Sequence, residues 1–347
     1  HLTLAHSSGK QKSYYVLIKY TVYNRGTVTM NKKPLIILTG PTAVGKTAAS
    51  IQLAKAVRGE IISADSMQIY QKMNIGTAKI TLEEMQGIPH HLVDAIPPDT
   101  PFHVYEFKKM AEQAMHEIWR RGHIPVVVGG TGFYIQALLY DIDFNPEEND
   151  HSYRAELEEL AGIKGTDFLH DRLKRIDPVS AECIHPNNIK RIIRALEYYH
   201  ETGSPISAHN QQQRTKNSPY DFIYIVLTMN RQKLYTRINK RVEQMFEQGL
   251  LEEAEALIRQ GCTSDMTSMQ AIGYKELFPY FEGKISREEA MEQIQQDTRH
   301  FAKRQLTWFR RERDVIFLDK DQFKEEETVV HEIVHLAEKR GIINHEE

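Results

Sequence analysis

The sequence lacks most of the features that mark secreted, membrane-spanning and metal-binding proteins. Only two cysteines occur in 347 residues, Cys183 and Cys262, and neither belongs to a CxxC or Cys/His pattern. Neither a disulfide framework nor a structural zinc site is therefore indicated. No apolar run approaches the roughly 18 residues that a membrane helix needs, and the mean hydropathy is -0.50. These absences exclude a membrane-spanning protein and predict a cytoplasmic one.

A large excess of one charge is also missing. The 44 Lys and Arg residues against 47 Asp and Glu give a formal net charge of -3, which excludes a globally basic nucleic-acid coat. Basic residues nevertheless gather at 190–194, 231–241 and 299–313. Each cluster alone is typical of a solvated helix face. A local basic surface for a nucleic acid therefore stays open at this point.

Strand-like and helix-like segments alternate along most of the chain. This alternation predicts an α/β fold in which helices flank a parallel sheet. Strands are expected at 35–39, 60–64, 124–128, 222–228 and 315–318; helices are expected at 46–57, 105–121, 153–160, 166–175 and 188–200, and through 231–311 with breaks near Gly261 and Gly283.

Changes in composition divide the chain into four parts. The N-terminal residues before Met30 show no signal-peptide pattern and are treated as an extension. A polar, helix-rich stretch interrupts the alternating segments and predicts an inserted helical subdomain. The expected parts are the extension 1–29, a core domain of 30–142 and 219–320, the insertion 143–218, and a C-terminal acidic helix in 321–347.

Two histidine patterns resemble metal sites. His90 and His91 are adjacent and have no third ligand at a fixed spacing, so a structural role is expected. His331 and His335 flank Glu332 in the HExxH pattern of zinc proteases. The apolar residues around them are typical of an amphipathic docking helix, so no metal is expected there.

A glycine-rich phosphate loop follows the first predicted strand and precedes a helix. Its sequence GPTAVGKT fits GxxxxGK[ST] in the structural context that this motif requires. The glycines let the backbone wrap a phosphate, and the N–H groups at the helix N-terminus supply positive potential. The loop predicts a P-loop NTPase-like core whose phosphate cradle consists of Gly40, Pro41, Thr42, Ala43, Val44, Gly45, Lys46 and Thr47, with Thr47 able to hold Mg²⁺.

The surroundings of the loop argue against a hydrolytic motor. The strand 124–128 runs into GGTG, where an ATPase would carry an aspartate for magnesium. Asp65 is the only carboxylate at a neighbouring strand end, and such ends face the ligand crevice in open α/β sheets. A helix cap, a magnesium ligand and a catalytic base are all open roles for it. A P-loop kinase and an RNA-binding module with a regulatory phosphate stay open as functions.

Seven motifs, in order, resemble the tRNA dimethylallyltransferase family. They are GPTAVGKT, DSMQIYQKMNIGTAK, GIPHHLVD, VVVGGTGFYIQALL, HPNNIKRIIRALE, QAIGYKEL and KRQLTWFRR, spanning about 34–311. The resemblance implies transfer of a dimethylallyl group from dimethylallyl diphosphate to the exocyclic amine of the adenosine 3′ of the anticodon. Pyrophosphate would leave with the assistance of Mg²⁺. A loop that holds a leaving diphosphate needs no water-positioning acid.

The resemblance also implies roles for individual residues. Asp65 would be the general base, with Thr42, Lys46 and Arg237 at the reacting centre and the diphosphate. The tRNA contacts would come from Asp65, Ser66, Met67, Gln68 and Thr131; from Lys190, Arg191, Ile192, Ile193 and Arg194; from Gln270, Ala271, Ile272, Gly273, Tyr274 and Lys275; and from Lys303, Arg304, Gln305, Leu306, Thr307, Trp308, Phe309 and Arg310. Trp308 and Phe309 among arginines suit base stacking with phosphate contact. The expected partners are the tRNA anticodon stem-loop and dimethylallyl diphosphate, for a monomer without an obligate protein partner.

Overall fold

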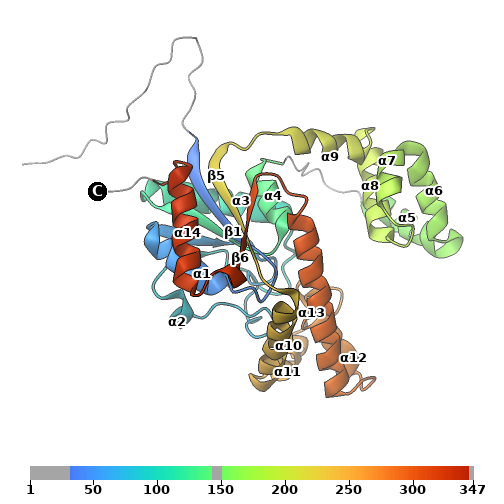
Figure 1. Cartoon of the computed structure of the whole chain (residues 1–347). Helices are drawn as coiled ribbons and strands as arrows, with labels where there is room; N and C mark the ends of the chain where they lie inside the picture. Colours follow the sequence, from blue (N-terminus) through green and yellow to red (C-terminus); the bar gives the residue numbers. More distant parts are fainter. Residues whose placement is uncertain (1–31, 143–150, 344–347) are drawn as a thin grey trace, which may run out of the picture. The chain divides into compact units, whose positions relative to one another are not determined.

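A six-stranded parallel sheet forms the centre of the computed structural model, which describes residues 32–142 and 151–343 (Figure 1). The strand order is β3-β2-β4-β1-β5-β6, and every pairing is parallel. The strands are β1 (Lys33–Thr39), β2 (Gly59–Ser63), β3 (His90–His91), β4 (Ile124–Gly129), β5 (Tyr220–Thr228) and β6 (Val315–Asp319). The predicted parallel sheet is confirmed, with β3 as an additional edge strand too short to show a period in the sequence.

Alternating residues of the central strand face two separate hydrophobic clusters. Leu35 and Ile37 of β1 join the cluster that contains α3 (Val104–Arg120) and α4 (Gly132–Leu139). Ile36 and Leu38 join the cluster that contains α1 (Lys46–Ala56) and α14 (Glu326–Lys339). Both faces of the sheet are therefore buried, which explains why β1 is a continuous apolar run.

The predicted C-terminal helix is present as α14, which lies beside α1 (Figure 1). Its Val329, Val330 and Ile333 are buried, whereas His331 and His335 are exposed. Within 32–142 and 151–343, no group of three or more His, Cys, Asp or Glu side chains is arranged to hold a metal ion. In the same ranges, no helix has the length and apolar character needed to cross a bilayer.

Five helices lie in the predicted insertion and share a hydrophobic cluster of their own. They are α5 (His151–Lys164), α6 (Thr166–Ile176), α7 (Pro178–Cys183), α8 (Ile189–Thr202) and α9 (Ile206–Thr215). The helices expected at 153–160, 166–175 and 188–200 are confirmed as α5, α6 and α8. The short helix α7 was not expected, although Asp177 caps it and Pro178 begins it, a recognisable start signal. The domain boundaries stay predictions.

The last third of the described chain is mostly helical, as expected. Its helices are α10 (Arg231–Glu247), α11 (Leu250–Arg259), the single turn α12 (Phe278–Phe281) and α13 (Arg287–Phe309); the remaining helix, α2 (Leu82–Met85), lies in the first half of the chain. The expected breaks near Gly261 and Gly283 are confirmed. A further break at Gly249, with φ +100°, separates α10 from α11.

A buried carboxylate holds the amino ends of three strands together. Glu60 of β2 is 2% exposed and accepts two hydrogen bonds from Arg121, at 2.8 and 2.7 Å. His91 of β3 and His123 before β4 each place a ring nitrogen 2.8 Å from the same carboxylate. The hydrogen bond from Arg121 first, then those from His91 and His123, lower the pKa of Glu60 to about 2, although burial raises it. This cluster anchors the strand whose other end carries Asp65.

Replacing Glu60 tests this anchor. The folded pKa of about 2 lies below the ordinary 4.5, so the stabilisation is present above about pH 4.5 and is lost as the pH falls towards 2. We expect Glu60→Gln to lower the free energy of unfolding by about 3 kcal/mol at pH 7. In urea denaturation the difference from the parent should shrink between pH 5 and 3.

The matched control is Glu117→Gln, because Glu117 is a half-exposed carboxylate 4.0 Å from Arg121. This control should change stability by less than about 0.5 kcal/mol. A Glu60→Gln difference that stays constant from pH 7 to 3 would contradict the role given to the carboxylate.

Candidate active site

The phosphate loop has a backbone that requires glycine at both ends. Gly40 has φ +147°, and a Cβ there would lie 2.5 Å from the Leu227 carbonyl oxygen. Gly45 is the N-cap of α1 and has φ +98°. The Lys46 ammonium donates hydrogen bonds to the Gly40 and Pro41 carbonyl oxygens, both at 3.0 Å. The predicted strand–loop–helix unit is thereby confirmed, with Lys46 folded back over its own loop.

Three cations and one carboxylate set the electrostatics of this loop. Burial lowers the pKa of Lys46 to about 8, while the charge of Asp65 opposes this shift and that of Arg241 adds to it. Burial also lowers the pKa of Arg241, again opposed by Asp65 and reinforced by Arg237. Positive charge therefore exceeds negative charge around the loop. An anion bound here would raise the pKa of Lys46 again, because a nearby negative charge favours the ammonium form. Arg241 was missed in the sequence, although it lies one helical turn after Arg237.

Asp65 lies just beyond the carboxyl end of β2 and is half-buried. Its Oδ1 accepts hydrogen bonds from the backbone N–H groups of Met67 at 2.9 Å and Gln68 at 3.3 Å. Within the described residues, Oδ2 receives no hydrogen bond. The capping role left open by the sequence is confirmed for one oxygen. The second oxygen is available for a substrate or a metal ion, because a carboxylate accepts on both oxygens.

The loop after Asp65 is fixed by helix α11 and by the segment that follows it. Glu253 accepts hydrogen bonds from the backbone N–H groups of Asn74, Ile75 and Gly76 and from the Tyr274 hydroxyl, at 2.6–3.1 Å. The Tyr274 ring packs so closely that a Cβ on Gly76 would lie 2.5 Å from it. Tyr274 is 1% exposed and supports the loop from within the core, so the tRNA contact predicted for its side chain is wrong.

Gln305 joins the phosphate loop to the turn after β4. Its side chain is 6% exposed, so the tRNA contact predicted for it is not available to the side chain in this structure. Its Oε1 accepts from the Thr42 N–H at 2.9 Å, and its Nε2 donates to the Gly130 carbonyl oxygen at 3.0 Å. Thr131, the next residue, accepts from the Ser66 N–H at 3.3 Å. The ends of β1, β2 and β4 are thus brought together around one site.

The basic end of α13 is divided between surface and core. Lys303, Arg304 and Arg310 are exposed, whereas Phe309 is fully buried. The stacking role predicted for Phe309 is therefore wrong, because the helix turns its ring into the core. Trp308 is half-buried against Gly132. A cavity of about 430 Å³ is lined by Arg191, His300, Lys303, Arg304, Thr307, Trp308 and Arg311.

The other predicted tRNA contacts show a similar division. Exposed members of the predicted set are Lys190, Arg191 and Arg194 on α8 and Gln270; half-buried members are Ser66, Met67, Gln68, Thr131, Ile272, Lys275 and Leu306; Ile192, Ile193, Ala271 and Gly273 are buried. The buried aliphatic side chains belong to the core, so their predicted side-chain contacts are wrong. Arg237 is exposed beside the phosphate loop, with Nη2 3.5 Å from the position of a Cβ on Gly45.

Comparison with known proteins agrees with this geometry. The chain matches the family model described as IPP transferase over residues 68–312 and the one described as isopentenyl transferase over residues 33–95. A tRNA dimethylallyltransferase of Lachnoclostridium phytofermentans is 55% identical over 311 residues, which cover 90% of this chain and 99% of that protein. The chain belongs to the tRNA dimethylallyltransferase family.

Solved structures of this family have the same fold. The chain is similar to a tRNA isopentenylpyrophosphate transferase from Bacillus halodurans, with 44% identity, a TM-score of 0.67 and coverage of 89% of this chain and 98% of that one. For a tRNA isopentenylpyrophosphate transferase from Staphylococcus epidermidis, the identity is 47% and the TM-score 0.66, with coverage of 89% of this chain and 100% of that one. For a eukaryotic dimethylallyltransferase acting on tRNA, the identity is 29% and the TM-score 0.75, with coverage of 91% of this chain and 81% of that one. The predicted fold class and family are confirmed.

The bridge made by Gln305 gives a prediction for this family member. Gln305→Leu leaves the Thr42 N–H and the Gly130 carbonyl oxygen without partners, which should cost about 1–3 kcal/mol of stability. It should also weaken the binding of dimethylallyl diphosphate, measured by calorimetry, because the loop is no longer fixed. Gln293→Leu, an exposed glutamine on the same helix, is the control. Equal donor affinity in the two variants would contradict the bridge.

Proposed function

We propose that the chain transfers the dimethylallyl group of dimethylallyl diphosphate to the exocyclic amine of the adenosine 3′ of the anticodon in tRNA. Membership of the family makes the chain a tRNA dimethylallyltransferase. One observation of the structure supports the detailed reaction most strongly. A carboxylate follows β2 and a cationic phosphate loop follows β1, at the carboxyl ends of the two strands that flank β4, and β4 itself ends in glycines where a hydrolase would carry its second acid.

The phosphate loop binds the diphosphate of the donor in this proposal. Lys46, Arg237 and Arg241 supply positive charge, and the N–H groups at the start of α1 supply hydrogen-bond donors. The exposed Thr47 lies at the first turn of α1, and its hydroxyl fits a Mg²⁺ ligand. A bound Mg²⁺ would neutralise charge that accumulates on the leaving diphosphate. Thr42 presents its backbone beside the reacting end of the donor.

Asp65 is the general base in this proposal. The adenine amine is a weak nucleophile because its lone pair is delocalised into the ring. As the new N–C bond forms, the bond between the allylic carbon and the diphosphate oxygen breaks, and its electron pair leaves with pyrophosphate. The amine proton passes to a carboxylate oxygen of Asp65, whose Oδ2 is open for it. No water and no ATP are consumed.

The tRNA must deliver one base into this site. Extruding a base from its stack costs a few kcal/mol, offset by contacts in the pocket. The exposed Lys303, Arg304 and Arg310 of α13 and the basic residues of α8 provide phosphate contacts. Trp308 at the edge of the basic cavity provides an aromatic surface.

We place the reaction in the cytoplasm, where a bacterial tRNA is found.

Mass analysis of nucleosides from tRNA tests the function directly. Unmodified tRNA incubated with the protein and dimethylallyl diphosphate should yield one dimethylallyl adenosine per tRNA, with pyrophosphate in equal amount. Addition of ATP should change neither quantity. Phosphate transfer from ATP to an acceptor, with no prenylated nucleoside, would instead identify a P-loop kinase.

Substitution of Asp65 separates its three possible roles. Asp65→Asn retains the size and much of the cap but removes the proton acceptor, so the single-turnover rate should fall about 10²–10⁴-fold while the affinities for tRNA and donor change little. A magnesium ligand would instead be rescued by excess Mg²⁺. A cap alone would lose about 1 kcal/mol of stability with normal chemistry. A normal rate in this variant would end the assignment of the base.

The basic surface of α13 predicts a salt dependence of tRNA binding. Each single replacement of Lys303, Arg304 or Arg310 by Met should weaken tRNA binding and flatten the slope of log affinity against log salt by roughly 0.7–0.9. Donor binding should be unaffected. Lys339→Met, an exposed cation near the end of α14, is the control. Unchanged slopes in all three variants would show that this surface is only a solvated helix face.

A further inference from the structure

We propose that Lys320 is an additional ligand of the donor diphosphate, and that Glu326 is its positioning residue. This inference rests on the proposed function. Lys320 begins a short 3-10 turn directly after β6. It lies outside the phosphate motif and beyond residue 312, where the match to the IPP transferase family ends. No sequence motif discussed above includes it.

The position of the Lys320 ammonium is the first reason for the proposal. A Cβ on Gly45 would lie 2.7 Å from Lys320 Nζ and 3.5 Å from Arg237 Nη2. Gly45 is the N-cap of α1, so both cations lie over the point where the N–H groups of that helix begin. Lys320, directly after β6, and Arg237 of α10 therefore both lie beside the phosphate loop, whose own Lys46 ammonium binds the loop carbonyls.

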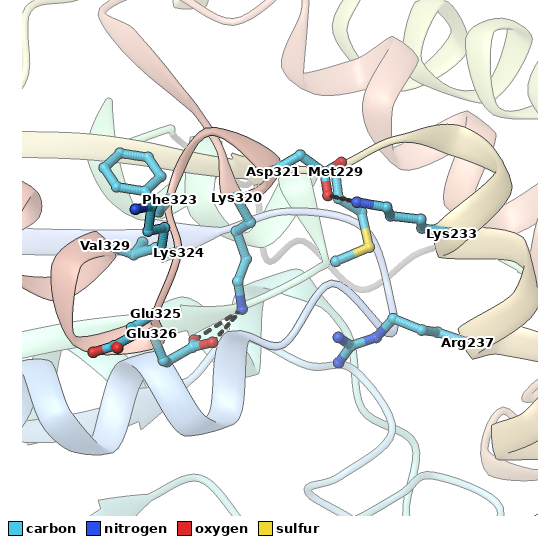
Figure 2. A pocket seen from close by; sticks show the side chains of 10 residues that line it. All are labelled: Met229, Lys233, Arg237, Lys320, Asp321, Phe323, Lys324, Glu325, Glu326 and Val329. Carbon is cyan, nitrogen blue, oxygen red and sulfur yellow. Dashed lines mark hydrogen bonds and ion pairs between the residues drawn. The ribbon is translucent and has the colours of Figure 1, made fainter.

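The bonding of Lys320 is the second reason. Its Nζ donates to both carboxylate oxygens of Glu326, at 2.9 and 2.6 Å. An ammonium has three N–H donors, so this pair leaves one for another acceptor. Figure 2 shows Lys320 extending to Glu326, with the Arg237 guanidinium directed towards the same space. Glu326 thus holds the ammonium in place without using all of its donors.

Burial and charge give the third reason. The Lys320 side chain is only 11% exposed, and it lies close to a second cation. Placing a largely buried ammonium beside the exposed Arg237 guanidinium is unfavourable unless an anion joins them. Glu326 compensates for one of the two charges. Both cations line a cavity of about 240 Å³, whose charged lining consists of Lys233, Arg237, Lys320 and Lys324 against Asp321, Glu325 and Glu326. Asp321 pairs with Lys233 and Glu326 with Lys320, so Arg237 and the third N–H donor of Lys320 face the phosphate loop.

The competing explanation is that Lys320 only ties α14 to the end of β6. Glu326 is the first residue of α14, and an ion pair there would stabilise the helix without any ligand. The two explanations differ in what Glu326→Gln should do. If the ion pair is only structural, Lys320→Met and Glu326→Gln should lower the melting temperature equally. If Lys320 binds the diphosphate, Lys320→Met should lower the affinity for it much more than Glu326→Gln does.

The experiment uses the full chain and inorganic pyrophosphate as the probe, with calorimetric binding and melting temperatures measured for each variant. We expect Lys320→Met to weaken pyrophosphate binding about tenfold or more, which is the size of one charge-assisted hydrogen bond. Lys320→Arg should restore most of this affinity. Glu326→Gln should lower the affinity only about threefold, because the glutamine oxygen still accepts one hydrogen bond from the ammonium and keeps it in position. The exposed Lys324→Met, in the same cavity, should stay within about twofold of the parent.

Steady-state kinetics supply the second measurement. Lys320→Met should raise KM for dimethylallyl diphosphate and lower kcat/KM, with the dissociation constant for tRNA unchanged. Parental pyrophosphate affinity in Lys320→Met, or equal losses of affinity and melting temperature in Lys320→Met and Glu326→Gln, would overturn the proposal. If the parent itself bound neither pyrophosphate nor donor, the proposed function would fail instead, so the two failures are distinguishable.

Discussion

Burial of the Lys46 ammonium against its own loop is the constraint on which the rest of the site depends. A buried cation is costly unless charges and hydrogen bonds compensate for it. Two loop carbonyls accept its hydrogen bonds, and Asp65 opposes the lowering of its pKa, which still reaches about 8. The positive charge of Arg241 lowers the pKa of Lys46 further. The site is therefore short of negative charge, which the diphosphate of the proposed donor would supply.

This shortage of negative charge also explains how one small site serves two chemical tasks. The leaving diphosphate gains charge during transfer, whereas the adenine amine loses a proton. Lys46 of α1 and Arg241 of α10 lie close enough to Asp65, after β2, for its charge to act on both. Gln305 joins the phosphate loop to the turn after β4, and Thr131 of that turn accepts a hydrogen bond from the Ser66 N–H, next to Asp65. At the amino end of β2, Glu60 binds Arg121, His91 of β3 and His123 before β4, and so joins three neighbouring strands.

Local patterns predict the sheet and the phosphate loop because their signals lie within short stretches of sequence. The buried strand β1 is a continuous apolar run, and GPTAVGKT carries its glycines at fixed positions. Family resemblance extends this to Asp65 and Arg237. The edge strand β3 has two residues, and such a segment has no measurable period.

Contacts between distant segments account for what sequence reasoning missed. Gln305 meets Thr42 across 263 residues, and Lys320 meets the loop only after β6 has folded beside β5. Both are ordinary polar residues without a local pattern. Sequence reasoning also placed buried residues on the surface. Phe309 and Ile192 lie among basic residues in the sequence, but the helices turn both side chains into hydrophobic clusters. A charged neighbourhood in the sequence does not place every member on the surface.

The most direct test of the account is the affinity of the full chain for dimethylallyl diphosphate as a function of pH, measured by calorimetry between pH 7 and 9.5. The donor is fully ionised across most of this range, since phosphate monoesters complete their ionisation near pH 6. With a free-state pKa of Lys46 of about 8, affinity should be constant below pH 8 and fall by up to about tenfold per pH unit above it. In Lys46→Arg the charge persists, and the fall should disappear. An affinity of the parent chain that stays constant to pH 9.5 would contradict the role assigned to the buried ammonium.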